Sequence, residues 1–169
     1  MTLGRLGNAG GMVVLLLLTG CLCVQSRPAP TANLPAYNFQ RFVYLEDAAE
    51  NTANASIGDL DSDGDPDIVL AKGRHWPQRD LVLLNNGQGD FGERHALGTQ
   101  EDRTYTAALA DLDGDQDLDL VVGNDRPDAK RVYFNDGHGQ FTAAGTFGEA
   151  RWSTRNVTVA DLDGDRRPD

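Results

Sequence analysis

Cysteine is scarce in this sequence, and both copies lie near the N-terminus. Cys21 and Cys23 are the only cysteines among 169 residues. The remainder of the chain therefore has no disulfide framework. Its stability is expected to come from sheet packing and from bound metal.

Basic residues are also few. Lys and Arg total 15 against 26 Asp and Glu, which gives a formal net charge of −11. This balance argues against nucleic acid or an anionic lipid surface as a partner. The acids are not spread evenly, because more than half of them fall in three short clusters that begin at Asp59, Asp111 and Asp161. Carboxylates packed this closely repel one another unless a cation is present.

The patterns of a nucleophilic enzyme are absent from the sequence. None of its serines lies in a G-x-S-x-G elbow. His75, His95 and His138 lie in separate turn regions without metal-ligand spacing, and each is expected at the surface. A non-catalytic module is therefore expected. The alternative is the N-terminal propeller part of a larger secreted enzyme, with its catalytic residues beyond residue 169.

The N-terminal segment has the form of an export signal. Arg5 supplies a positive charge before an apolar run that is short for a bilayer-spanning helix. Leu18-Thr19-Gly20-Cys21 resembles the bacterial lipobox, which implies lipidation of Cys21 and attachment to a membrane, more specifically the outer one. A cleaved signal of a secreted or periplasmic protein and an uncleaved anchor remain alternatives. Residues 21–36 are rich in proline and predict an extended tether.

From residue 37 onward the chain repeats itself with a period of about fifty residues. Asp59, Asp111 and Asp161 are 52 and 50 residues apart. Each unit has an alternating segment, an Asp-rich loop, a β-branched run, a variable loop and a second apolar run. The alternating segments are residues 54–57, 104–110 and 155–160, the β-branched runs 67–71 and 118–123, and the second apolar runs 81–84 and 132–134. A glycine-rich turn with a Phe follows: Asn85-Asn-Gly-Gln-Gly-Asp-Phe91 and Asn135-Asp-Gly-His-Gly-Gln-Phe141. Such turns are strong hairpin signals, and four short strands per unit predict a propeller blade.

These Asp loops and N-x-G-x-G-x-F turns resemble the FG-GAP or VCBS repeats of integrin-α-like β-propellers. The resemblance implies an all-β incomplete propeller with two four-stranded antiparallel blades, residues 37–93 and 94–143, and the first half of a third, residues 144–169. Because family propellers close with more blades, the chain is expected to be a fragment of a longer protein. Self-association into a closed ring is the alternative.

The Asp loops predict calcium sites. Carboxylates at positions 1, 3, 5 and 9, with the backbone carbonyl at position 7, supply the hard oxygen ligands that Ca²⁺ prefers. Gly64 occupies position 6 of the first loop, where Gln116 and Arg166 stand in the others, and this predicts weaker binding by the second loop. The expected ligands are Asp59, Asp61, Asp63, Asp65 and Asp67; Asp111, Asp113, Asp115, Asp117 and Asp119; and Asp161, Asp163, Asp165, Arg167 and Asp169.

Other interpretations of these loops fit less well. An EF-hand needs an acid at position 12, where Leu70 and Val122 stand in strand-like runs. Mg²⁺ prefers fewer carboxylates and more water. Solvated acidic turns without metal remain the structural alternative.

The loops at the other end of each blade are expected to form a ligand face for an unknown protein or carbohydrate. An exposed tryptophan beside arginine and histidine is typical of recognition surfaces; packing of Trp76 over the blade edge is the alternative. The residues expected on this face are Arg74, His75, Trp76, Arg126 and Trp152.

Overall fold

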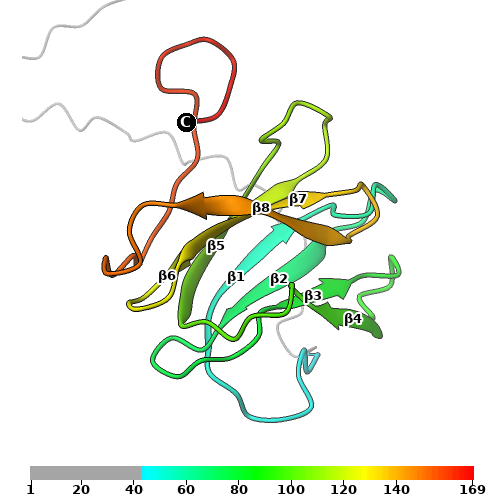
Figure 1. Ribbon diagram of the computed structural model, residues 1–169. Helices are drawn as coiled ribbons and strands as arrows, with labels where there is room; N and C mark the ends of the chain where they lie inside the picture. The colour runs from blue at the N-terminus through cyan, green and yellow to red at the C-terminus, as the bar shows by residue number, and fades with distance from the viewer. Residues whose placement is uncertain (1–42) are drawn as a thin grey trace, which may run out of the picture. The chain divides into compact units, whose positions relative to one another are not determined.

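The computed structural model describes residues 43–169 (Figure 1). The expected signal, the lipidated Cys21 and the tether lie outside the described residues. The described part contains eight β-strands in two four-stranded antiparallel sheets, which confirms the all-β class and agrees with propeller blades. Among residues 43–169, no helical segment has the length and hydropathy of a membrane span.

Each repeat forms one sheet whose strands follow their order in the chain. The first sheet consists of β1 (Thr52–Gly58), β2 (Asp67–Lys72), β3 (Leu81–Leu84) and β4 (Glu93–Ala96). The second consists of β5 (Thr104–Ala110), β6 (Asp119–Asn124), β7 (Lys130–Asn135) and β8 (Phe141–Phe147).

The two sheets share one hydrophobic core. The β-branched and leucine-rich runs of β2, β3 and β6 are almost entirely buried, because strands covered on both faces need apolar side chains throughout. Leu60, from the first Asp loop, is only 1% exposed and belongs to the same cluster as Leu120 and Tyr133 of the second blade. The blades therefore pack face to face through side chains of both repeats.

The structure places the blade limits later than the sequence suggests. Residue 93 is the first residue of β4, and residue 143 lies within β8, so both expected boundaries fall in the fourth strands. The strands end where their pairing with β3 and β7 ends, at Ala96 and Phe147. Residues 155–160, the expected first strand of a third blade, are not a strand. Among the described residues no strand pairs with them, and a β-strand needs a hydrogen-bonded neighbour.

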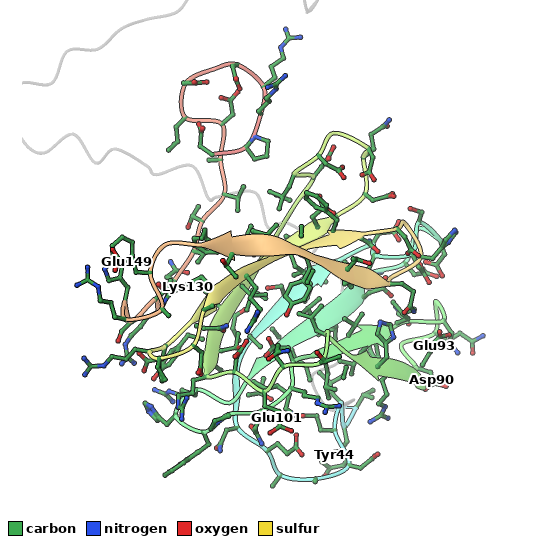
Figure 2. The ribbon with its side chains drawn as sticks, viewed as in Figure 1. Tyr44, Asp90, Glu93, Glu101, Lys130 and Glu149 are labelled. Carbon is green, nitrogen blue, oxygen red and sulfur yellow. The ribbon has the colours of Figure 1, made fainter. Side chains whose placement is uncertain are left out.

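The loops fall at two opposite ends of the sheets. The first two Asp loops each connect the first strand of a blade to the second. The turn between the third and fourth strands lies beside each of them, since the N–H of Asn85 donates to Oδ1 of Asp67 (2.8 Å) and that of Asn135 to Oδ1 of Asp119 (2.9 Å). Figure 2 shows Asp90 and Glu93 at this end and Lys130 and Glu149 at the other. We call the loops at that other end the distal loops: residues 73–80, 97–103, 125–129 and 148–155.

Candidate metal centres

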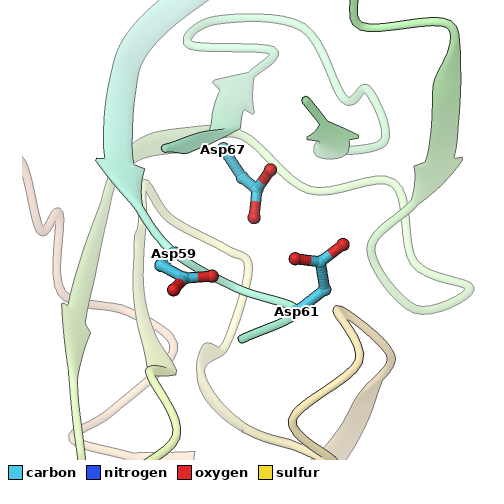
Figure 3. A group of neighbouring side chains, drawn as sticks. All are labelled: Asp59, Asp61 and Asp67. Carbon is cyan, nitrogen blue, oxygen red and sulfur yellow. The ribbon is translucent and has the colours of Figure 1, made fainter. Parts of the chain in front are cut away.

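The first Asp loop, residues 59–67, gathers three carboxylates around one point. Asp59, Asp61 and Asp67 each offer an oxygen within 4.8 Å of the others, and Figure 3 shows the carboxylates turned toward a common space. Asp61 and Asp63 also line an open hollow of about 290 Å³ beside the β3–β4 turn. Convergent carboxylate oxygens with open space between them form a coordination shell suited to a hard cation.

The aspartate at position 9 anchors each loop to the sheet. Asp67 is fully buried, and its Oδ2 accepts from the N–H of Leu60 (2.7 Å) while its Oδ1 accepts from Asn85. Asp119 repeats this arrangement, with Oδ2 accepting from Leu112 (2.8 Å) and Oδ1 from Asn135 (2.9 Å). Both carboxylates thus hold their loop closed, and Asp67 also belongs to the converging group of the first loop.

The aspartate at position 1 closes the turn and leaves acceptor capacity free. Oδ2 of Asp59 accepts from the N–H of Gly64 (3.0 Å). Its Oδ1 is buried and has no hydrogen-bond partner among the described residues. A buried acceptor oxygen is normally satisfied by a donor or a cation. Since the converging side chains, Asp61 and Asp67, are also carboxylates, this orphaned oxygen fits a bound cation.

The second and third loops, residues 111–119 and 161–169, have the same backbone hydrogen bonds. Asp111 accepts from Gly114 (2.7 Å) and Gln116 (3.1 Å), and Asp161 accepts from Gly164 (2.7 Å) and Arg166 (2.8 Å). The carboxylates that converge are, in the second loop, Asp111, Asp113 and Asp115 and, in the third, Asp161, Asp163 and Asp169.

Not every expected ligand joins these groups. Positions 1 and 3 converge in all three loops, whereas Asp63, Asp119 and Asp165 lie outside the group of their own loop. Asp63 and Asp165 instead accept the N–H two residues on, at 2.8 Å each. The third loop is exposed throughout, because no strand of its own packs against it.

Two residues in each loop have positive φ, and the sequence predicts only one of them. Gln116 has φ of 81° and Arg166 has φ of 72°, as expected for position 6. Position 4 also has positive φ: Ser62 in the first loop (64°), against Gly114 (89°) and Gly164 (84°) in the others. Each loop therefore contains one glycine and one strained residue, so the expected weakness of the second loop has no basis in backbone strain.

Negative charge is concentrated in the first and second Asp loops. Burial, followed by the charge of Asp67 and then those of Asp63 and Asp59, raises the pKa of the Asp61 carboxyl, although a backbone hydrogen bond opposes the shift. Burial first, and then the charges of Asp113 and Asp115, raise the pKa of Asp119. A cation at the centre of each loop would relieve this repulsion.

The side chains at position 7 of the first two loops, Asp65 and Asp117, lie close to the turn between the third and fourth strands of their blade. A Cβ built on Gly87 would lie 2.4 Å from Oδ2 of Asp65, and one on Gly137 would lie 2.5 Å from Oδ2 of Asp117. Both glycines also have positive φ. The turn between the third and fourth strands therefore needs glycine where the Asp loop approaches it.

The structure also shows linking residues that the sequence analysis missed. The carbonyl of Leu60 accepts from Nδ2 of Asn135 (2.8 Å) and from the N–H of Gly139 (2.8 Å), both in the second blade. His95, expected at the surface, is half-buried and bonds through Nε2 to the carbonyl of Gly139 (2.8 Å). Asn85 and Asn135 occupy the same position in the two glycine-rich turns, and this repeated asparagine is the sequence feature that could have indicated a structural role for Asn135.

The expected ligand-face residues lie in the distal loops and are exposed. Trp76 is 67% exposed and Trp152 is 52% exposed, so neither ring is packed over a blade edge. His75 bonds through Nδ1 to the hydroxyl of Tyr105 (3.0 Å), a residue that the sequence analysis missed. Arg74 and Arg126 are exposed as well.

Comparison with known proteins supports the repeat assignment. The family model for the FG-GAP-like repeat matches residues 59–122 and 111–169, each match beginning at an Asp loop. No curated protein and no solved structure gives a significant match.

Proposed function

Because the chain belongs to the FG-GAP-like repeat family, we propose that it is an exported, calcium-binding propeller module that recognises a protein or a carbohydrate and has no catalysis of its own. The orphaned, buried Oδ1 of Asp59 carries the metal half of this proposal. Asp59 lies beside the carboxylates of Asp61 and Asp67, and a cluster of three aspartates recurs in the two further loops.

Calcium suits these loops better than magnesium does. The converging groups are carboxylates on a loop whose backbone amides already donate to them, so a cation with several flexible oxygen ligands fits the arrangement. Magnesium binds fewer carboxylates and keeps its water. The ligands that we propose for the first site are Asp59, Asp61, Asp63 and Asp67 with the Asp65 carbonyl, and their counterparts in the other loops.

Calorimetric titration of chelator-treated protein tests the metal half. We expect Ca²⁺ to bind in the presence of excess Mg²⁺, and Asp61→Ala and Asp113→Ala each to remove one site. Asp90→Ala is the matched control, because Asp90 lines the same hollow outside the loop. Absence of binding heat, or equal loss in the control, would contradict the proposal.

Export and anchoring form the other part of the proposal, supported by the apolar N-terminal run and the Leu18-Thr-Gly-Cys21 motif. Cys21→Ser is expected to release the protein from bacterial membranes when cells are fractionated. Unchanged membrane association would instead indicate an uncleaved helix.

A further inference from the structure

The distal loops form a continuous row across both blades. The loop after β2 is joined to the start of β5 by a bridge between Gly73 and Thr104. The N–H of Asp125 donates to the carbonyl of Arg103 (2.8 Å), and the N–H of Thr154 donates to that of Asn124 (3.2 Å). Side chains from four separate segments are therefore held side by side on one surface.

Tyr105 lies at the middle of this row, between cationic groups. The guanidinium carbon of Arg155 is 4.4 Å from the centre of the Tyr105 ring, and that of Arg74 is 6.0 Å from it. The His75 ring meets the Tyr105 ring edge-on at 5.9 Å, in addition to its hydrogen bond with the hydroxyl. We call these four residues the Tyr105 cluster.

One arginine of the cluster is fixed in place and the other is free to bind. Arg155 lies 3.5 Å from Oδ2 of Asp125. A hydrogen bond from Ser153 lowers the pKa of Asp125, as do the backbone amide of Arg126 and the charges of Arg155 and Arg126, so Asp125 stays charged. Within the described residues, Arg74 makes no ion pair, and its side chain is exposed beside the ring. The guanidinium N–H groups of Arg74 are therefore available to a ligand beside the Tyr105 ring.

We propose that the Tyr105 cluster binds the carboxylate of an acidic saccharide, with Arg74 and His75 contacting the carboxylate and the exposed Trp76 ring stacking on the sugar. This rests on the proposed recognition function and names its ligand class. Arginine pairs with carboxylates through two parallel hydrogen bonds. Aromatic side chains with one polar edge give large contact area at low entropic cost.

The charge of the chain favours a local anionic group over a long polyanion. The net charge of −11 repels densely charged polymers such as nucleic acid, whereas a saccharide in which uronic acid alternates with a neutral sugar bears one charge per two sugar rings. Two exposed tryptophans in the same row of loops offer apolar faces that match sugar rings better than acidic side chains of a peptide.

Calorimetry with two matched sugars tests the inference. The probes are a hexasaccharide of alternating glucuronic acid and N-acetylglucosamine, and the neutral hexamer of N-acetylglucosamine, both titrated into the full chain with calcium present. We expect the acidic hexamer to bind at least tenfold more tightly. Arg74→Ala should lower its affinity at least fivefold, and Arg74→Lys should lower it less, since lysine keeps the charge without the fork.

Arg79→Ala is the matched control, because Arg79 is exposed in the same loop and pairs at 3.9 Å with Glu101 outside the cluster. It should change the affinity less than twofold, and thermal melts should show that all variants fold. Equal loss in Arg79→Ala and Arg74→Ala would overturn the cluster as the site, as would equal binding of the neutral sugar. Absence of sugar binding with calcium binding intact would overturn this inference alone; absence of calcium binding would overturn the proposed function.

Discussion

Each Asp loop contains one non-glycine residue in a strained backbone conformation with positive φ. Every loop uses positive φ at positions 4 and 6, yet each supplies only one glycine: Gly64 in the first loop, Gly114 in the second and Gly164 in the third. A non-glycine residue in this conformation costs about 1 kcal/mol. Ser62, Gln116 and Arg166 therefore carry comparable penalties that a metal site must offset.

Relieving that strain should tighten calcium binding in either complete loop. Ser62→Gly in the first loop and Gln116→Gly in the second should each raise calcium affinity by up to about fivefold, which corresponds to about 1 kcal/mol. Calorimetric titration measures this. Gln116→Ala is the control, because it removes the side chain and keeps the strain. The strain argument fails if Gln116→Ala tightens binding as much as Gln116→Gly does.

Asp80 is a buried acid between the blades. Its Oδ1 accepts from the N–H of Lys72 (2.7 Å), and its Oδ2 accepts from the Thr104 hydroxyl of the second blade (3.0 Å). Burial above all, helped by the charge of Asp102, raises its pKa to about 7 against these hydrogen bonds. The folded state therefore holds a proton that the unfolded state releases near pH 4.

This raised pKa predicts falling stability between about pH 4 and 7, because the folded state binds more protons across that window. Asp80→Asn stays neutral; its Oδ1 can still accept from the N–H of Lys72, while its Nδ2 would donate to the Thr104 hydroxyl oxygen, so that bond is kept in the reverse direction. It should match the wild type near pH 4 and exceed it by about 1–3 kcal/mol at pH 8, measured by urea unfolding across the range. Asp90→Asn, at an exposed position, should leave the pH slope unchanged. A slope that persists in Asp80→Asn would assign it to another group.

At the scale of elements, the sequence predicts the strands that carry strong local patterns. Leu81–Leu84 and Thr104–Ala110 are strands with the expected limits, because a buried apolar run and an alternating segment each indicate a strand by themselves. A fourth strand was expected in each unit but without limits, since the polar residues of Glu93–Ala96 have no strand pattern of their own and form a strand by pairing with β3. Residues 155–160 show the converse: the pattern is present and the partner strand is not.

For the candidate sites, too, the local sequence predicts some features, while others depend on contacts between distant residues. The spacing of the aspartates predicts which residues lie in each loop, and positions 1 and 3 do converge. The spacing does not predict the positive φ of Ser62. It does not predict the role of Tyr105 either, because Arg155, which lies fifty residues away in the sequence, contacts the Tyr105 ring only in the folded protein. Contacts between repeats depend on the twist and stacking of whole sheets.

Asn85 and Asn135 occupy the same position in the two glycine-rich turns, but they are predicted to contribute differently to the free energy of unfolding. Asn135 is buried, and its Nδ2 donates to Leu60 of the other blade and to Leu118 (3.3 Å). Asn135→Ala should destabilise the protein by about 1–3 kcal/mol in urea unfolding, because two hydrogen bonds of about 0.5–1.5 kcal/mol each are lost, although the Leu60 carbonyl keeps its bond from Gly139. The side chain of the half-buried Asn85 bonds only within its own repeat, because its Nδ2 donates to Pro66 (3.1 Å) and its Oδ1 accepts from Gly87 and Gly89. Asn85→Ala should therefore cost less, since it removes no contact between the blades. Equal costs would show that the contact between blades contributes nothing extra.

Across the described molecule, one peptide segment connects the first metal loop to the second blade. The N–H of Leu60 donates to Asp67 inside the loop, and its carbonyl accepts from Asn135 and Gly139. Its side chain is buried in the shared core. The corresponding Leu112 is half-buried, and Leu162 is 81% exposed. Burial of this leucine thus follows how completely a further blade covers it, so the Asp loop presents a docking surface for the next repeat.

Calcium in the first loop should therefore protect backbone amides of the second blade. Ligand binding to the folded state stabilises it by RT ln(1 + [L]/Kd), about 2.7 kcal/mol at a hundredfold excess over Kd. The Gly139 amide, which donates to Leu60 across the blades, should exchange at least tenfold more slowly with calcium than with chelator. Hydrogen exchange read by NMR measures it. Because Asp117 of the second loop approaches the same turn at Gly137, Asp61→Ala and Asp113→Ala must be compared. Loss of the calcium effect in Asp61→Ala, with partial retention in Asp113→Ala, is the expected result. If only Asp113→Ala abolishes the effect, each blade is ordered by its own metal, and the Leu60 connection transmits nothing.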